Sequence, residues 1–182
     1  GRKLAKVGQP AADTAEMFFD DVRVPVANLL GEEGKGFSYL MHDLSQERFL
    51  IAVNAAMQLE RLLDITLQYV KERKAFGQTV WDFQNTKFKL ADAKASAVAV
   101  RTMVDYYIAE HMRRKLTVEE AAIAKLFSTE TLWKHLDDMV QVHGGYGYML
   151  EYPIARAFTD LRITRVYGGA SEVMRELIAR KL

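Results

Sequence analysis

The chain has 182 residues, 49% of them hydrophobic, and a formal net charge of +1 from 25 basic and 24 acidic residues. Because these charges balance, composition gives no indication of a nucleic-acid or strongly acidic partner. The absence of cysteine excludes disulfides, thiolate nucleophiles and cysteine metal sites. The four histidines have no spacing typical of a metal site. No uncharged apolar run approaches the roughly 20 residues needed to cross a bilayer.

Residues 1–30 differ in composition from the rest of the chain. The stretch AEMFFDDVRVPVANLL is rich in Phe and Val and is broken by Pro25, which predicts short strands and a turn. The following GEEGKG (31–36) matches neither a dinucleotide fingerprint nor a Walker loop, so we interpret it as a linker. We therefore divide the chain at residue 30. Because it starts at Gly1 without a methionine, we expect it to be a piece of a longer protein.

Long helices are predicted for most of residues 31–182. Glycine and proline are absent from Phe37 to Phe76 and from Gln78 to His143, in stretches rich in good helix formers. Within the second stretch, Thr117 followed by Glu120 forms a capping-box pattern that starts a new helix. Shorter helices are expected near Pro153 and over residues 171–181. Long helices with short connections predict a mainly α fold, a helical bundle with a short β segment at its N-terminus.

The apolar positions repeat at helical spacing and define the faces expected to be buried. In the first helix these are Leu40, Leu44, Ile51, Ala55 and Leu62. In the second they are Phe88, Ala91, Ala95 and Val98, followed by Val100, Met103, Val104 and Tyr107.

Glu47 is the first candidate functional residue. Spacings of four, three, four and four residues place it on the apolar stripe of the first helix, whereas Asp43 and Arg48 lie off that stripe. A carboxylate withdrawn from water is a better general base for a weakly acidic C–H. The alternative is a glutamate at the stripe's edge that reaches water or pairs with a basic residue.

Two helix ends combine cations with glycines. ERKAFG (72–77) carries Arg73 and Lys74, which suit a helix C-terminus, and the guanidinium of Arg73 could also hold a phosphate. QVHGGYGY (141–148) is either a helix cap with a turn or a place of close backbone approach to a ligand. A third glycine turn, in RVYGGASEVM (165–174), carries no acid, base or nucleophile.

Taken in order, several stretches resemble the C-terminal half of an acyl-CoA dehydrogenase. They are DTAEMFFDDVRVPVANLLGEEGKGF, ERKAFGQTVWDFQ, QVHGGYGYMLEYPIARAFTDLRI and YGGASEVMRELIAR. The resemblance implies that residues 1–30 end the family's middle β domain and that residues 31–182 form its C-terminal four-helix bundle. It also implies an FAD enzyme that oxidises an acyl-CoA to a trans-2-enoyl-CoA and passes electrons to an electron-transferring flavoprotein.

The resemblance also assigns the catalytic base. Most members carry Tyr-Glu-Gly-Thr at the third glycine turn, but here Gly168 follows Tyr167, so that glutamate is missing. The long-chain and isovaleryl-type branches carry it instead on the first long helix, in a stretch that resembles DLSQERFLIA, where it is Glu47. By resemblance, the backbone N–H of Gly168 contacts the thioester carbonyl, and Arg48 and Tyr167 contact substrate.

The resemblance further implies residues near FAD. One set would reach the FAD of a neighbouring subunit: Arg73, Lys74, Ala75, Phe83, Gln84, Gln141, Val142, His143, Gly144 and Gly145. A second set would lie near the FAD of the same subunit: Ala170, Ser171 and Glu172. Shared sites imply a homotetramer, in a bacterial cytoplasm or a mitochondrial matrix. A non-catalytic subunit of a mixed assembly, an acyl-CoA oxidase and a plain helical interaction module remain as alternatives.

Overall fold

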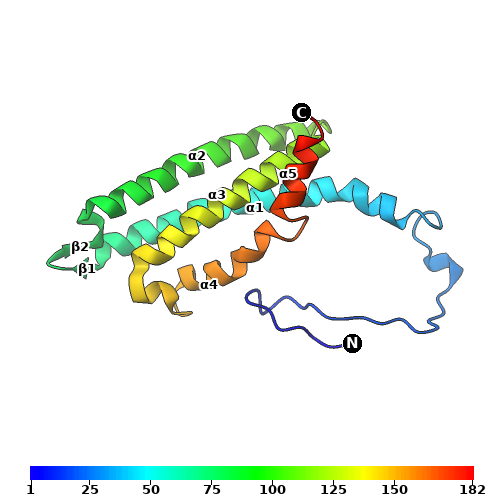
Figure 1. Cartoon of the computed structure of the whole chain (residues 1–182), viewed down its shortest axis with the longest axis horizontal. Helices are drawn as coiled ribbons and strands as arrows, with labels where there is room; N and C mark the ends of the chain where they lie inside the picture. The colour runs from blue at the N-terminus through cyan, green and yellow to red at the C-terminus, as the bar shows by residue number, and fades with distance from the viewer.

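The computed structural model describes residues 1–182, which form three long helices, two short helices and an extended N-terminal segment (Figure 1). The long helices α1 (Gly36–Glu72), α2 (Gln84–Met112) and α3 (Val118–His143) lie side by side. The short helices α4 (Pro153–Leu161) and α5 (Ser171–Ala179) pack along α3. The expected number, order and type of the helices are confirmed.

The helix ends follow from local sequence. The capping box at the start of α3 is present: the Thr117 hydroxyl accepts from the Glu120 backbone N–H at 3.1 Å, and the Glu120 carboxylate accepts from the Thr117 N–H at 2.8 Å. Pro153 begins α4 at a position where a missing N–H costs nothing. After α1, a small hairpin of β1 (Lys74–Ala75) and β2 (Gln78–Thr79) turns through Phe76 and Gly77, both with positive φ. The 3-10 helix η2 (Val80–Asp82) then leads into α2.

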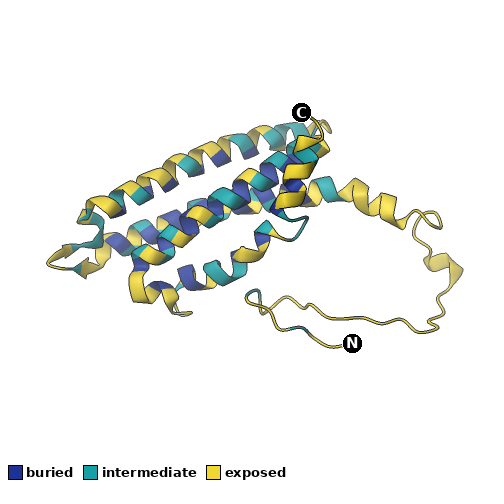
Figure 2. Cartoon of the chain, in the orientation of Figure 1, coloured by how far each residue is buried: buried dark blue, intermediate teal, exposed yellow.

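The bundle core is formed mainly by α1, α2 and α3, which present their buried faces to one another (Figure 2). Ala55 and Leu62 of the predicted α1 stripe are buried, but Leu40 is 66% exposed because this first part of α1 extends beyond the other helices. No helix of the structure is long and apolar enough to span a membrane.

The predicted buried face of the first half of α2 is wrong. Phe88 and Val98 are 59% and 54% exposed, and Ala91 and Ala95 are also exposed. The core instead takes a neighbouring stripe, made up of Thr86, Leu90, Ala93, Ala97, Val100 and Val104. Because α2 is rich in alanine and valine around its circumference, it carries two apolar stripes, and periodicity alone does not show which one faces α1 and α3.

The predicted strands in residues 1–30 are also wrong for this structure. The segment has one isolated bridge, between Lys3 and Ala15, and one 3-10 helix, η1 (Val26–Asn28). A strand is stabilised by a neighbouring strand and by a surface under its apolar face. Neither is present here, since Phe18 and Phe19 are 78% and 77% exposed. The segment touches the bundle where Gln9 donates its side-chain amide to the Asp160 carbonyl at 3.1 Å.

Thr117→Ala should lower the free energy of unfolding by about 1 kcal/mol, since the Glu120 backbone N–H at the start of α3 loses the hydroxyl that accepts its hydrogen bond. Chemical unfolding monitored by circular dichroism measures this change. Thr102→Ala is the matched control: this exposed threonine bonds back to the Val98 carbonyl within α2, and alanine there should be neutral or stabilising. Equal stability of Thr117→Ala and the wild type would contradict the prediction.

Candidate functional site

The turn between α4 and α5 has a backbone conformation that favours glycine at both of its central positions. Gly168 and Gly169 have φ angles of 65° and 104°, a region that side chains disfavour. A Cβ at Gly168 would also lie 2.6 Å from Ile51 Cδ1, and one at Gly169 would lie 2.7 Å from Met174 Cε. The turn therefore carries no side chain of its own that could act as a base.

Two cations from different helices hold this turn. Arg48 Nε on α1 donates to the Gly168 carbonyl at 2.9 Å, and Lys125 Nζ on α3 donates to the Gly169 carbonyl at 2.8 Å. Arg48 is 9% exposed and Lys125 is 0% exposed. Burial lowers the pKa of both groups, that of Lys125 to about 8, while the charge of Glu47 opposes the shift at Arg48.

The backbone N–H groups of the turn are left free by these contacts. Gly168, Gly169 and Ala170 donate no backbone hydrogen bond to an acceptor within the chain. Tyr167, which precedes them, is half-buried, and burial raises its pKa. The turn thus offers donors beside a partly buried aromatic side chain, an arrangement that suits a carbonyl oxygen on which charge develops.

Of the two interpretations of Glu47, the structure agrees with a glutamate at the stripe's edge that reaches water and not with a buried one, and the expectation that Arg48 lies off the buried stripe is wrong. In the structure Glu47 is exposed and Arg48 is buried. Successive residues are about 100° apart around a helix, so both flank the stripe, and the carbonyl of Gly168 draws Arg48 inward. Glu47 still lies near the turn, because Ile51, one helical turn further on the same face, is in contact with Gly168.

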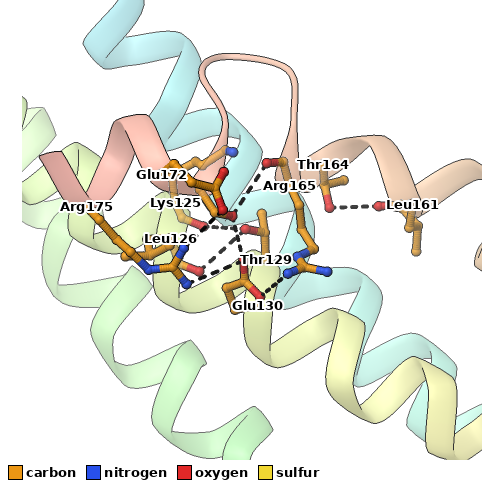
Figure 3. A network of polar contacts seen from close by, with 10 residues as sticks. Lys125, Leu126, Thr129, Glu130, Leu161, Thr164, Arg165, Glu172 and Arg175 are labelled. Atoms are coloured by element: carbon orange, nitrogen blue, oxygen red, sulfur yellow. Dashed lines mark hydrogen bonds and ion pairs between the residues drawn. The ribbon is translucent and has the colours of Figure 1, made fainter. Parts of the chain in front are cut away.

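A second set of charges fixes α5 to α3 (Figure 3). Glu130 on α3 pairs with Arg165 at 2.8 Å and accepts a hydrogen bond from the hydroxyl of the buried Ser171, the first residue of α5. Arg175 approaches the same carboxylate at 4.0 Å. Burial alone would raise the pKa of Glu130, but Ser171 and Arg165 together outweigh it and lower the pKa.

The predicted residues at the start of α5 have different environments. Ala170 occupies the N-cap position and makes no side-chain cap, Ser171 is buried against Glu130, and Glu172 is exposed beside Arg175. The hydroxyl of Ser171 is thus already engaged within the chain.

The other glycine-rich junction forms a separate site at the opposite end of α3. Arg73, the C-cap of α1, lies 5.1 Å from the ring of Tyr146, and the Tyr69 hydroxyl donates to the His143 carbonyl at 3.1 Å. Here the structure brings several predicted residues around one open pocket of about 510 Å³, namely Arg73, Ala75, Val142, His143, Gly144 and Gly145. Burial lowers the pKa of His143, which favours its neutral form.

The remaining members of that predicted set do not line the pocket. Lys74 is exposed in β1 and paired across the hairpin with Thr79. Phe83 is the N-cap of α2, with its ring 6.4 Å from that of Phe76, and Gln84 is the first residue of α2. Gln141 is exposed on α3.

The pocket combines a mostly apolar lining with one guanidinium and a glycine backbone that could hold an anionic group. Arg73 is exposed and makes no ion pair, so its guanidinium donors are available. Gly144 needs glycine for its φ of 60°, but Gly145 does not have positive φ, and a Cβ there would meet nothing within 4 Å. Within the chain, therefore, neither conformation nor packing requires glycine at 145, which is consistent with close approach from outside the chain.

The two sites lie far apart in the bundle. Lys125 and His143 stand near opposite ends of α3, and at 1.5 Å per residue they are separated by about 27 Å along the helix. Figure 1 shows the same arrangement, with α5 near one end of the long helices and the β1–β2 hairpin at the other.

Lys125 and Glu130 were not among the predicted site residues. Lys125 occupies a buried position of α3 in register with Ala121, Ser128 and Leu132, so a charged residue on an apolar stripe was visible there as well. Glu130 gave no such signal, because its role depends on Arg165 and Ser171, which reach it only through the turn after α4.

The structure is a mainly α bundle with two glycine-rich turns, each beside a candidate ligand site, and this combination indicates the class of protein. The family model for the acyl-CoA dehydrogenase C-terminal domain matches residues 34–182. The chain belongs to the acyl-CoA dehydrogenase family.

Individual relatives agree over the whole chain. It is 50% identical over 182 residues to the mitochondrial long-chain specific acyl-CoA dehydrogenase of Sus scrofa, covering 100% of this chain and 42% of that protein. It matches the crystal structure of an acyl-CoA dehydrogenase from Geobacillus kaustophilus with a TM-score of 0.95 and 49% identity, over 100% of this chain and 48% of that one. Butyryl-CoA dehydrogenase from Megasphaera elsdenii matches with a TM-score of 0.92 and 38% identity, over 100% and 47%. The chain thus spans about half the length of these relatives.

Glu130→Gln should destabilise the protein at neutral pH and much less in acid. A folded-state pKa below the ordinary 4.5 means that the ionised carboxylate stabilises the fold above that pH and that this contribution disappears as pH falls through the lowered pKa. Thermal unfolding at pH 7 and near pH 3.5 measures the difference between variant and wild type. In the control Glu176→Gln, an exposed pair with Arg180 is removed, which should change stability little at either pH. A Glu130→Gln effect of equal size at both pH values would contradict the prediction.

Proposed function

We propose that this chain is the C-terminal half of an FAD-dependent acyl-CoA dehydrogenase that converts an acyl-CoA thioester to a trans-2-enoyl-CoA. Residues 1–30 would then be the end of a middle β domain and residues 31–182 the C-terminal bundle. The exposed apolar side chains of residues 1–30, such as Phe18 and Phe19, support this division, because they suit a sheet lying outside the chain. The observation that carries the proposal is the contact between Arg48 and the Gly168 carbonyl, which joins the helix segment of Glu47 to the turn.

Glu47 would remove the α-proton of the substrate. Its carboxylate lies on the face of α1 that meets the turn at Ile51, and it is open to the space where a substrate would lie. In this chain the site is exposed, so the desolvation that strengthens the base would come from the bound substrate and from domains outside the chain. Gly168 itself supplies no acid, which leaves the proton transfer to a residue on another element.

The turn would stabilise the charge that develops on the thioester oxygen. The backbone N–H of Gly168 has no acceptor within the chain and is available for this oxygen. Arg48, which holds the Gly168 carbonyl, would keep the donor in place, and Tyr167 would lie beside the thioester. When bound, FAD supplies the acceptor for the β-hydrogen, which leaves as hydride.

A basic pocket on the first part of α1 would suit the phosphate-bearing part of the substrate. It has a volume of about 610 Å³, begins one turn before Glu47 and is lined by His42, Ser45, Gln46, His111, Met112, Arg114 and Leu116. Its histidine, hydroxyl and guanidinium donors are of the kind that bind phosphate oxygens.

The pocket around Arg73 would hold the FAD of a neighbouring subunit, and Ala170, Ser171 and Glu172 would lie near the FAD of the same subunit. The separation of about 27 Å between the two sites supports two different cofactors rather than one. The apolar stripe of α2 that is exposed in this chain suits association with further copies. We therefore propose a homotetramer, with electrons passing to an electron-transferring flavoprotein. An acyl-CoA oxidase differs in the electron acceptor, so the rate of flavin reoxidation by air separates the two.

Glu47→Gln in the full-length protein should slow flavin reduction by acyl-CoA at least about 100-fold, because the amide keeps the shape of the side chain but accepts no proton. Anaerobic stopped-flow measurement at saturating palmitoyl-CoA gives the rate, and titration gives the affinity, which should be preserved. Asp43→Asn is the matched control, since it neutralises another exposed carboxylate one helical turn earlier on α1. A near-normal rate in Glu47→Gln would exclude Glu47 as the base. A wild type whose flavin is not reduced by acyl-CoA would instead favour a non-catalytic subunit.

Arg73→Ala should weaken FAD retention roughly 10- to 100-fold, as expected for the loss of a charge-assisted bond of about 1.5–3 kcal/mol. Gly145→Ala should also reduce retention, and because a Cβ there meets nothing in the chain, its helical content should not change. Flavin content after gel filtration and the elution volume report retention and assembly. Arg113→Ala, an exposed arginine at the far end of α2, is the control. Unchanged flavin content in both pocket variants would place FAD elsewhere.

A further inference from the structure

Lys125 is a fully buried charged residue for which the proposed chemistry has no use. It is 0% exposed, and its neighbours on the buried face of α3 include Ala121, Ala124 and Leu132. Placing an ammonium group in such surroundings costs free energy unless a partner compensates it. A methionine or leucine would fill the same space without that cost, so the charge calls for a physical reason.

An ion pair does not account for the buried charge of Lys125. Lys125 forms no salt bridge, and the nearby carboxylate of Glu130 is shared by Arg165, Arg175 and the Ser171 hydroxyl. The single hydrogen bond of its ammonium group goes to a neutral acceptor, the carbonyl of Gly169, at 2.8 Å. In Figure 3, Lys125 lies beside the loop that joins Arg165 to α5.

The Lys125 hydrogen bond acts on the glycine turn, whose own residues do not fix its conformation. Two successive glycines have the widest backbone freedom of any residues, and the turn has no side chain to anchor it. Arg48 holds the Gly168 carbonyl and Lys125 holds the next one, at Gly169. Because each peptide unit is planar, holding these two successive carbonyls restricts φ and ψ of Gly169, the residue that joins their peptide units. The free Gly168 N–H belongs to the preceding peptide unit, which is held between these two carbonyls on one side and the hydrogen bond from the Tyr167 N–H to the Ile163 carbonyl, at 3.0 Å, on the other.

We infer that Lys125 is a positioning residue for the thioester carbonyl: through the Gly169 carbonyl it holds the downstream side of the turn and so restricts the direction of the Gly168 N–H. Arg48 and Lys125 then form a pair of clamps, one from α1 and one from α3, on the two carbonyls of the turn. The inference rests on the proposed function, since it concerns the same substrate oxygen.

The test uses full-length, FAD-loaded protein with Lys125→Met, which keeps the length and apolar stem of the side chain and removes its donors. Lys89→Met is the matched control: it removes a partly buried lysine that joins α2 to Asp138 of α3, away from the turn. One measurement is the rate of flavin reduction at saturating palmitoyl-CoA together with the dissociation constant. The other is the infrared frequency of the carbonyl of bound, carbonyl-¹³C-labelled trans-2-hexadecenoyl-CoA.

For Lys125→Met we expect flavin reduction to slow about 10-fold, less than the roughly 100- to 1,000-fold effect of deleting such a donor outright. The dissociation constant should change little, and the carbonyl frequency should move toward that of the free thioester. Lys89→Met should leave the frequency at the wild-type value. Lys125→Gln, which keeps an N–H donor without the charge, should fall between wild type and Lys125→Met.

An unshifted carbonyl frequency in folded, FAD-loaded Lys125→Met would overturn the inference. So would a rate that falls only in proportion to flavin content, because that result indicates a purely structural role. If Lys125→Met does not fold, the frequency in Lys125→Gln, compared with that in Lys89→Met, decides in the same way. If acyl-CoA does not reduce the flavin of the wild type at all, the proposed function is wrong. If it reduces the flavin of wild type and Lys125→Met equally fast, only the inference about Lys125 is wrong.

Discussion

The carbonyls of Gly168 and Gly169 accept hydrogen bonds from two buried cations, Arg48 at 2.9 Å and Lys125 at 2.8 Å, and much of the bundle depends on this convergence. The donors come from α1 and α3, so the turn can be held only where these two helices are packed in one register. Burying two positive charges is costly, and backbone carbonyls compensate part of that cost only in this arrangement. Glu130, paired with Arg165 and Ser171, then fixes the start of α5 beside the turn. The packing of α1 against α3 and the geometry of the turn therefore depend on the same two hydrogen bonds.

The sequence was sufficient to predict the helices but not all of their buried faces. Absence of glycine and proline, the capping box at Thr117 and the helix start at Pro153 are local features, and the structure confirms them. Burial of one α2 stripe rather than the other depends on where α1 and α3 lie, which is tertiary information. Residues 1–30 show the same limit, because a strand pattern specifies a strand only when a partner strand is present.

The site was predicted in part, and for similar reasons. Arg73 and Gly145 were joined by a family resemblance, and the pocket brings them together although they are far apart in sequence. Glu47 and Arg48 were assigned the reverse of their observed burial, because neighbouring residues at the edge of a stripe differ by only about 100° in direction. The hydrogen bond to the Gly168 carbonyl accounts for the burial of Arg48 rather than Glu47. Because this acceptor belongs to the backbone, the spacing of side chains in the sequence does not reveal it.

The geometry of the turn also bears on where a catalytic carboxylate can be. A Cβ at position 168 would lie 2.6 Å from Ile51 Cδ1, and the φ of 65° adds backbone strain for any side chain. Ile51 occupies the space toward which a residue at 168 would project, and it lies one helical turn after Glu47 on the same face of α1. An acid at 168 would therefore require the end of the Ile51 side chain to move aside, whereas an acid at 47 leaves this contact unchanged. The packing of Ile51 against Gly168 thus fits a turn without a side chain, in keeping with the proposal that the catalytic carboxylate lies on α1.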